Sequence, residues 1–135
     1  MTHTAEAAAV TAYDRIGGMA AVRGFVDRFY DLMETDPAYA ELRALHAADL
    51  APIRESLAGF LAAWLGGPGD WFADHPGVCM MSAHARVAVS GETARQWTEA
   101  MARALADCGI EPALRARMNA AFLQTAEAMA ASRGG

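Results

Sequence analysis

The sequence predicts a single all-α domain, and three observations support this fold class. Hydrophobic residues recur every three or four positions over most of the chain, which is the spacing of one face of a helix. Glycine and proline stand at the points where these patterns stop. The length of 135 residues suits one domain with its own hydrophobic core.

The patterns predict four long helices. Asp49 and Pro52 suit the beginning of the second helix, and Gly-Gly-Pro at residues 66–68 suits its end. Ser90 is expected to begin the third helix and Pro112 the fourth. The side chains expected to face the core are Val22, Phe25, Val26, Phe29, Tyr30 and Met33 on the first helix, Ile53, Leu57, Phe60, Leu61 and Trp64 on the second, Ala94, Trp97, Met101, Leu105 and Cys108 on the third, and Leu114, Met118, Phe122, Thr125 and Met129 on the fourth.

Composition and charge argue against several classes of protein. Hydrophobic residues make up 54% of the chain and charged residues 20%, which is a globular composition. The net charge of −5 argues against nucleic acid and anionic membranes as partners. No apolar run approaches the roughly 20 residues of a membrane span, and residues 1–12 lack the features of a signal peptide. Cys79 and Cys108 fit a reducing compartment, so we expect a cytoplasmic protein with two free thiols.

Residues 66–89 fit no helical pattern and contain a histidine among apolar side chains. The segment begins GGPGDWFADHPG, which is too rich in glycine and proline for regular structure. Long irregular stretches in small domains are usually functional. The segment ends in CMMSAHARVAV, where His84 has no carboxylate or second histidine within four residues. Two interpretations of His84 stay open at this point: a core histidine bonded to the backbone, or an axial ligand to a haem.

Other metal centres fit the sequence less well. HExxH and CxxC motifs are absent, as is a triad of carboxylates at ligand spacing, so zinc and non-haem iron have little support. The absence of CxxCH excludes a covalently attached c-type haem. A single histidine is enough for a non-covalent haem, because the porphyrin supplies the equatorial iron ligands.

Seven short motifs make the chain resemble the truncated haemoglobins, and group II among them. Each motif alone is weak, but all seven stand in the order and spacing of that family over about residues 12–130. The resemblance implies a two-over-two helical sandwich, with a domain at residues 13–131 and tails at 1–12 and 132–135. The motifs are YDRIGG (13–18), FVDRFYDLM (25–33), LRALHAADL (42–50), FLAAWLGGP (60–68), HP (75–76), SAHARVAV (82–89) and QWTEAM (96–101).

The resemblance also implies a non-covalent b-type haem with His84 as the proximal ligand to iron. The distal tyrosine of the family falls on Tyr30, and the tryptophan of group II falls on Trp97. Both side chains carry a hydrogen-bond donor on a large apolar body, and a bound O2 would accept such bonds. The other residues expected at the haem are Ile53, Leu57, Phe60 and Leu61 on the second helix, with Trp71, Met80 and Arg86 in the irregular segment.

The chain departs from the family at three functional positions. One is the region just after the proximal histidine, where the usual phenylalanine is absent and the chain has Val87. Family members often have tyrosine or phenylalanine at the corner where this chain has His46. That histidine is a distal hydrogen-bond donor, a sixth ligand to iron, or a surface residue. Many members carry an arginine before the proximal histidine that pairs with a haem propionate, whereas this chain has alanine there. Arg86, Arg54 or Arg43 is the candidate to replace that arginine.

Two functions remain open on the sequence alone. The first is a haem protein that binds O2 and other diatomic ligands, for redox, NO or peroxide chemistry or for sensing, with an unidentified reductase as partner. The second is a haem-free helical interaction module, for which the missing arginine is the best argument. Beyond Tyr30 and His46 no acid–base pair is visible, so an enzymatic activity stays undecided, as does the choice between monomer and homodimer.

Overall fold

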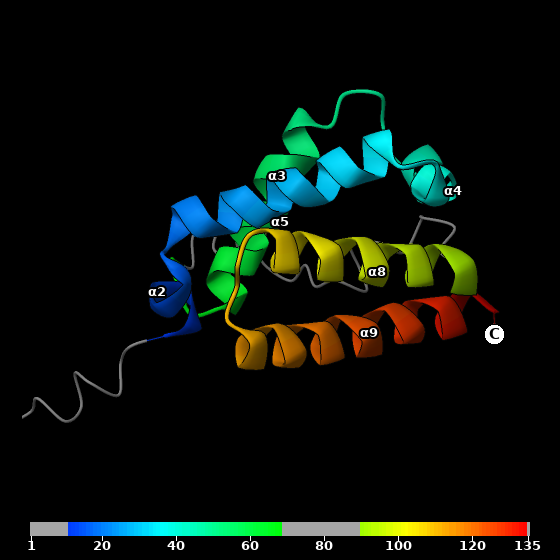
Figure 1. The fold of residues 1–135 in the computed structure, drawn as a ribbon. Helices are drawn as coiled ribbons and strands as arrows, with labels where there is room; N and C mark the ends of the chain where they lie inside the picture. The colour runs from blue at the N-terminus through cyan, green and yellow to red at the C-terminus, as the bar shows by residue number, and fades with distance from the viewer. Residues whose placement is uncertain (1–10, 69–89, 135) are drawn as a thin grey trace, which may run out of the picture.

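The computed structural model describes residues 11–68 and 90–134, with side chains described as far as residue 128. Every regular element in these ranges is a helix, which confirms the all-α prediction (Figure 1). None of these helices is long and apolar enough to cross a membrane. The division of the chain into a domain and two tails stays a prediction. The helices are α2 (Ala12–Ile16), α3 (Met19–Thr35), the 3₁₀ helix η1 (Pro37–Tyr39), α4 (Ala40–Ala44), α5 (Ala51–Trp64), α8 (Gly91–Asp107) and α9 (Pro112–Gly134).

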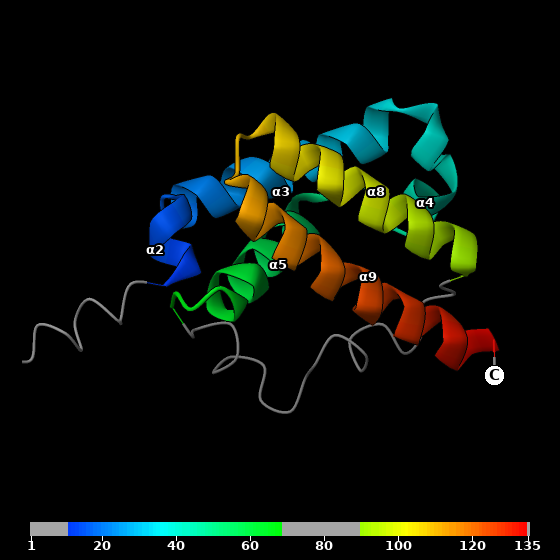
Figure 2. The ribbon, with the colours of Figure 1, turned by 60° about the horizontal axis from the view of Figure 1, so that its bottom comes forward.

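The four long helices form two packed pairs. One pair is α3 with α5, and the other is α8 with α9. The pairs meet where α3 packs on α8, so α8 lies between α3 and α9 (Figures 1 and 2). This arrangement confirms the predicted two-over-two sandwich.

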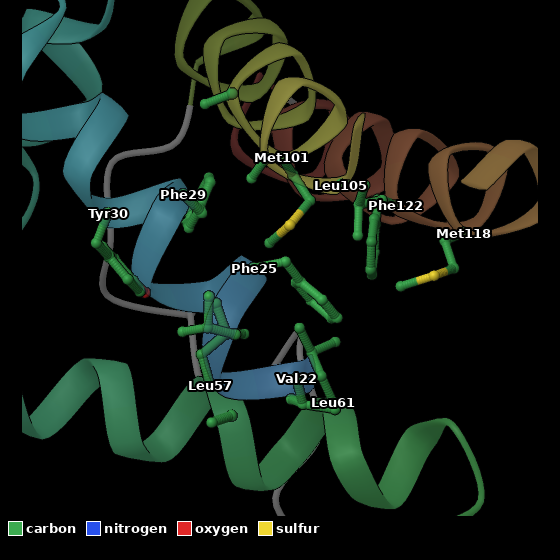
Figure 3. Packing of buried hydrophobic residues seen from close by; sticks show 14 of the residues in the cluster. Val22, Phe25, Phe29, Tyr30, Leu57, Leu61, Met101, Leu105, Met118 and Phe122 are labelled. Atoms are coloured by element: carbon green, nitrogen blue, oxygen red, sulfur yellow. The ribbon is translucent and has the colours of Figure 1, made fainter. Parts of the chain in front are cut away.

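Helix α3 supplies the centre of the hydrophobic core. Its predicted inner face is confirmed, and Leu32 extends it (Figure 3). Burying an apolar side chain of this size contributes about 1.5–3 kcal/mol, so this face is a main source of the free energy of folding. The buried side chains of α3 are Val22, Phe25, Val26, Phe29, Tyr30, Leu32 and Met33.

Helices α8 and α9 begin where the sequence predicts. Ser90 is the N-cap of α8: its hydroxyl accepts from the Thr93 N–H, and the Thr93 hydroxyl accepts from the Ser90 N–H, which is a capping box. Cys108 is a free thiol, as predicted, while Cys79, the other predicted thiol, lies outside the described residues. Its expected place on the inner face is wrong, because Cys108 is the C-cap residue and is exposed where the helix ends. The predicted inner-face residues that are buried are Ala94, Met101 and Leu105 on α8 and Leu114, Met118 and Phe122 on α9.

Helix α5 begins one residue later than the sequence predicts. Its N-cap residue is Leu50, and the preceding Asp49 carboxylate accepts a hydrogen bond from the Ala51 N–H at 3.0 Å. Asp49 therefore stabilises the first turn without being the N-cap. Pro52 lies in that first turn, as predicted.

The prediction that Ile53 and Trp64, at the two ends of the α5 stripe, face the core is wrong. Ile53 and Trp64 have exposed fractions of 38% and 43%. The buried stripe of α5 runs only through its middle, between Leu57 and Ala62, so it is shorter than the hydrophobic pattern. The buried residues of α5 are Leu57, Ala58, Leu61 and Ala62.

The short helix α2, which is not among the predicted helices, lies against the end of α5. The Tyr13 N–H donates to the Leu65 carbonyl at 3.0 Å. A Cβ atom at Gly67 would lie 2.5 Å from the Tyr13 ring, and one at Gly66 would lie 2.8 Å from the Thr11 side chain. The two glycines therefore allow this close approach as well as ending α5.

Candidate functional site

The candidate site is centred on Tyr30, a buried tyrosine on α3. Only 2% of its surface is exposed. Its ring makes edge-to-face contacts with Phe29, at a centroid distance of 4.8 Å, and with His46, at 5.9 Å. Figure 3 shows the ring extending from α3 toward α5. The Tyr30 side chain therefore lies between three elements: α3, α5 and the corner after α4.

The Tyr30 hydroxyl is a protonated hydrogen-bond donor. Burial raises the pKa of this hydroxyl far above its ordinary range, and the positive charge of Arg54 offsets the rise only in part. Within the described part of the chain, no group accepts a hydrogen bond from it. An unpaired donor on a largely buried side chain suits a site that an acceptor enters from outside the protein.

Arg54 on α5 lies against the Tyr30 ring and is bound to α3. Its guanidinium carbon is 5.6 Å from the ring centroid, which is a cation–π distance. The guanidinium donates to the carboxylates of Asp27 and Asp31 at 3.0 Å each, and to that of Glu34 at 3.4 Å. Arg54 thus ties α5 to α3 beside the candidate site, with its guanidinium held by three carboxylates of α3.

Arg43, another candidate for the propionate, also has partners within the protein. Its guanidinium donates to the carbonyls of Ala47 and Ala48 at 3.0 and 2.9 Å, and lies 3.6 Å from the Glu34 carboxylate. It stabilises the chain between α4 and α5. The third candidate, Arg86, lies outside the described residues.

His46 is half-buried and lies beside Tyr30, as a distal residue would. Its Nδ1 is 2.9 Å from the Leu42 carbonyl oxygen. A carbonyl only accepts, so Nδ1 carries the hydrogen, and in the neutral ring Nε2 then has a lone pair. A neutral His46 is therefore an acceptor or a metal ligand at Nε2, and it donates there only as imidazolium. His46 therefore matches the predicted role of a distal donor only when its imidazole is protonated.

Trp97 brings a second donor from another helix. It is half-buried on α8, and its ring contacts Phe29 at 5.1 Å and Phe122 at 5.3 Å between centroids. Among the described residues none accepts a hydrogen bond from the indole N–H. Phe29 contacts both Trp97 and Tyr30, so the two expected distal residues share contacts with one phenyl ring.

The four α5 residues expected at the haem divide into two groups. Leu57 and Leu61 are buried in the core, with exposed fractions of 9% and 0%. Phe60 is half-buried against the core and Ile53 is exposed. These four residues lie on one face of α5, which the core covers at the two leucines and leaves partly open at Phe60 and Ile53.

Gln96 is a further residue near the site that the sequence reasoning missed. It is 2% exposed, and its side-chain oxygen accepts from the Leu42 N–H at 3.1 Å. Its amide nitrogen donates to Glu92 at 2.9 Å and to Glu41 at 3.3 Å. Gln96 thus holds α4, and with it the corner of His46, against α8. Helical periodicity does not reveal such a residue, because a polar side chain at that spacing normally faces water.

The remaining expected site residues lie outside the described residues. They are the proposed proximal ligand His84 and the proposed haem contacts Trp71, Met80 and Arg86. In the part of the chain that is described, no cluster of three or more histidine, cysteine or acidic residues could hold a metal ion by itself.

A separate cleft with a volume of about 490 Å³ lies between α2, α3 and the turn from α8 to α9. Ile16, Cys108, Ile110 and Leu114 are among the residues that line it. None of the residues expected at the haem lines this cleft, so it is not the candidate site.

Comparison with solved structures places the chain among small haemoglobins. The truncated haemoglobin of the Antarctic bacterium Pseudoalteromonas haloplanktis superposes with a TM-score of 0.84 and 32% identity, over 88% of this chain and 96% of that one. The group II two-on-two haemoglobin of Agrobacterium tumefaciens has a TM-score of 0.85 and 32% identity, over 89% and 93% of the two chains. The haemoglobin of Chloroflexus aurantiacus has a TM-score of 0.79 and 34% identity, over 88% and 96%.

A sequence model of one family agrees with these structures. The model described as bacterial-like globin matches residues 11–131. A search of curated proteins found no match. The helix pairs, the buried tyrosine on α3 and the matched length lead to one conclusion: the chain belongs to the bacterial-like globin family, which implies a haem cofactor.

Proposed function

We propose that this globin holds a b-type haem without a covalent bond and binds O2 and other small diatomic ligands beside Tyr30. The observation that carries the proposal is the protonated hydroxyl of the buried Tyr30 side chain, which has no acceptor among the described residues. The indole N–H of Trp97, whose ring contacts the same Phe29 ring as Tyr30, supplies a second donor. Two donors on rigid helices suit a small ligand that carries partial negative charge.

The residues of the chain fit a haem at this place. When bound, the haem supplies an iron atom that binds O2 and shifts electron density onto it. His84 is proposed as the proximal ligand, with Arg86 near a propionate and with Trp71 and Met80 as apolar contacts. On α5 the proposed contacts are Ile53, Leu57, Phe60 and Leu61; the exposed Ile53 in particular presents apolar surface that a porphyrin would cover.

We propose a cytoplasmic protein, a monomer or a homodimer, that uses its bound ligand in redox, NO or peroxide chemistry or in sensing, with a reductase as electron donor. Tight hydrogen bonding to the ligand slows its release, which suits reaction or sensing better than delivery of O2.

The test is the visible spectrum of the purified protein and of His84→Ala. The wild type should show the Soret band of a bound haem. His84→Ala should lose most of its haem, or show an altered spectrum that added imidazole reverses. His75→Ala is the matched control, because His75 lies in the same segment and has no proposed role. Normal haem content and an unaltered spectrum in His84→Ala would contradict the ligand assignment, and a wild type that binds no haem would favour the interaction module.

A further inference from the structure

Five aromatic rings form a continuous row across the molecule, which we call the aromatic row. It begins at Tyr30 and continues through Phe29 and Trp97, with centroid distances of 4.8 and 5.1 Å. It passes to Phe122 at 5.3 Å and ends at Trp64 at 5.5 Å. The row therefore links α3, α8, α9 and the end of α5; Figure 3 shows its members Tyr30, Phe29 and Phe122.

The two ends of the row differ in their access to solvent. Tyr30 is buried, whereas Trp64 has an exposed fraction of 43%, unlike the core position that its helical spacing predicts. Trp97 lies within the row at the candidate haem site, and only the Phe122 ring stands between its indole and that of Trp64. Ring contacts thus join Trp64, an oxidisable side chain exposed to solvent, to Trp97, an oxidisable side chain at the candidate haem site.

Indole and phenol are the most easily oxidised aromatic side chains, while a phenyl ring only carries an electron by tunnelling. Tunnelling becomes exponentially slower with distance, so one large step is much slower than two shorter ones. Trp97 can hold the oxidised state between two shorter electron-transfer steps, and Phe122 fills the space between Trp97 and Trp64 with close-packed atoms. The aromatic row therefore has the composition and spacing of a path for single electrons.

We propose that Trp64 is a second reaction site, where phenols in solution give up electrons that travel along the aromatic row to a haem oxidised by hydrogen peroxide. This inference rests on the proposed haem binding. It assigns to the exposed end of the row a substrate class, phenolic one-electron donors in solution.

The electrons and protons balance over one turnover. Hydrogen peroxide accepts two electrons and two protons and yields two molecules of water. Each electron passes from the Trp64 indole to Trp97 across Phe122, and the oxidised Trp64 indole releases its N–H proton to solvent. A phenol then returns one electron and one proton to Trp64 and leaves as a phenoxyl radical. Two phenols are consumed for each peroxide.

The first experiment locates the radical on the protein. The haem-loaded protein is treated with hydrogen peroxide and a nitroso spin trap, and the adduct is mapped by mass spectrometry. We expect an adduct on Trp64 that is absent in Trp64→Phe, a change that keeps a ring but removes the oxidisable indole. Tyr13→Phe is the matched control, because it removes a half-buried phenol outside the row, and the Trp64 adduct should persist in it.

The second experiment follows guaiacol oxidation together with the peroxide-induced change of the Soret band. Trp64→Phe should slow guaiacol oxidation about tenfold while leaving the Soret change at its wild-type rate. Phe122→Leu should reduce the Trp64 adduct although Trp64 is still present, with thermal unfolding used to confirm that the fold is intact. Absence of a Trp64 adduct in a protein with normal haem and a normal Soret change would overturn this inference alone. A protein without a Soret band would overturn the proposed function and this inference with it.

Discussion

At the scale of single residues, the site depends on how Tyr30 is held. Phe29 and His46 fix its ring from two sides, and Arg54 covers it with a guanidinium that three carboxylates of α3 bind. The resemblance to group II proteins predicted Tyr30, but it did not predict Arg54 in this place. The reason is that the Arg54 contacts depend on the crossing of α5 over α3, which no local pattern in the sequence specifies.

Replacing Arg54 should destabilise the fold. In Arg54→Met the carboxylates of Asp27, Asp31 and Glu34 lose their shared partner and repel one another along α3. Because the Arg54 side chain is only 23% exposed, we expect a loss of about 1–2 kcal/mol in the free energy of unfolding. Urea denaturation measures it, and high salt should shrink the difference.

A matched control for Arg54 exists on the same pair of helices. Arg23 on α3 pairs with Glu55 on α5, but both side chains are more exposed, at 48% and 65%. Arg23→Met should therefore cost no more than about 0.5 kcal/mol. Equal losses in the two variants would contradict the special role of Arg54.

At the scale of elements, the sequence predicts the long helices better than the short ones. The face of α3 and the starts of α8 and α9 follow from hydrophobic spacing, Ser90 and Pro112. The short helix α2 has local signals, a capping box of Thr11 and Asp14 and a C-cap at Gly17, but with five residues it is too short to show a hydrophobic stripe, which is the pattern that predicts the long helices. The exposure of Ile53 and Trp64 was not predicted, because the spacing of hydrophobic residues identifies one face of a helix. How much of that face is buried depends on the neighbouring helices.

Replacing Gly67, which lies after α5, and Gly24, which lies in α3, by alanine should change the stability of the protein in opposite directions. In Gly67→Ala the new Cβ would lie 2.5 Å from the Tyr13 ring, which forces α2 away from α5. We expect a loss of about 1–3 kcal/mol. Gly24 lies in α3, and outside the neighbouring backbone of its own helix nothing lies within 4 Å of the position a Cβ would take. Gly24→Ala should therefore stabilise the protein by about 0.5–1 kcal/mol. Thermal unfolding of both variants is the measurement, and stabilisation by Gly67→Ala would contradict the described contact.

The start of α8 should contribute to the pH dependence of stability. Hydrogen bonds from Arg95, and then from Gln96, lower the pKa of Glu92 from 4.5 to about 2. A lowered folded-state pKa means that this contribution is complete above pH 4.5 and is lost as the pH falls toward 2. Wild type should therefore lose more stability than Glu92→Gln between pH 5 and pH 3, as measured by urea midpoints.

The control for this pH effect is Glu127→Gln, which changes an exposed carboxyl on α9. This variant should keep the acid sensitivity of the wild type. The same pH dependence in wild type and Glu92→Gln would show that the bonds from Arg95 and Gln96 do not persist in solution.

At the scale of the whole molecule, the two helix pairs bring distant parts of the chain to one site. Tyr30 comes from α3, His46 from the corner after α4, and Trp97 from α8. Family resemblance, and not spacing, predicted that these three residues belong together. Gln96 was not predicted, because its role depends on α4 and α8 lying side by side.

The measurement that tests the account most directly is the rate of O2 release from the reduced haem protein, followed by stopped-flow ligand displacement. Tyr30→Phe removes the hydroxyl and keeps the ring contacts with Phe29 and His46. A hydrogen bond to a partly charged acceptor contributes about 1.5–3 kcal/mol. Each of Tyr30→Phe and Trp97→Phe should therefore release O2 roughly ten to a hundred times faster, with CO release less affected.

The double variant and a control complete this measurement. Combining both changes should accelerate release by less than the product of the single effects, because both donors serve one ligand. Tyr39→Phe is the control, since its hydroxyl donates to Glu99 at 3.0 Å and is not part of the site. Faster O2 release in both single variants, and not in Tyr39→Phe, is the predicted result. Unchanged O2 release in both Tyr30→Phe and Trp97→Phe would contradict the account.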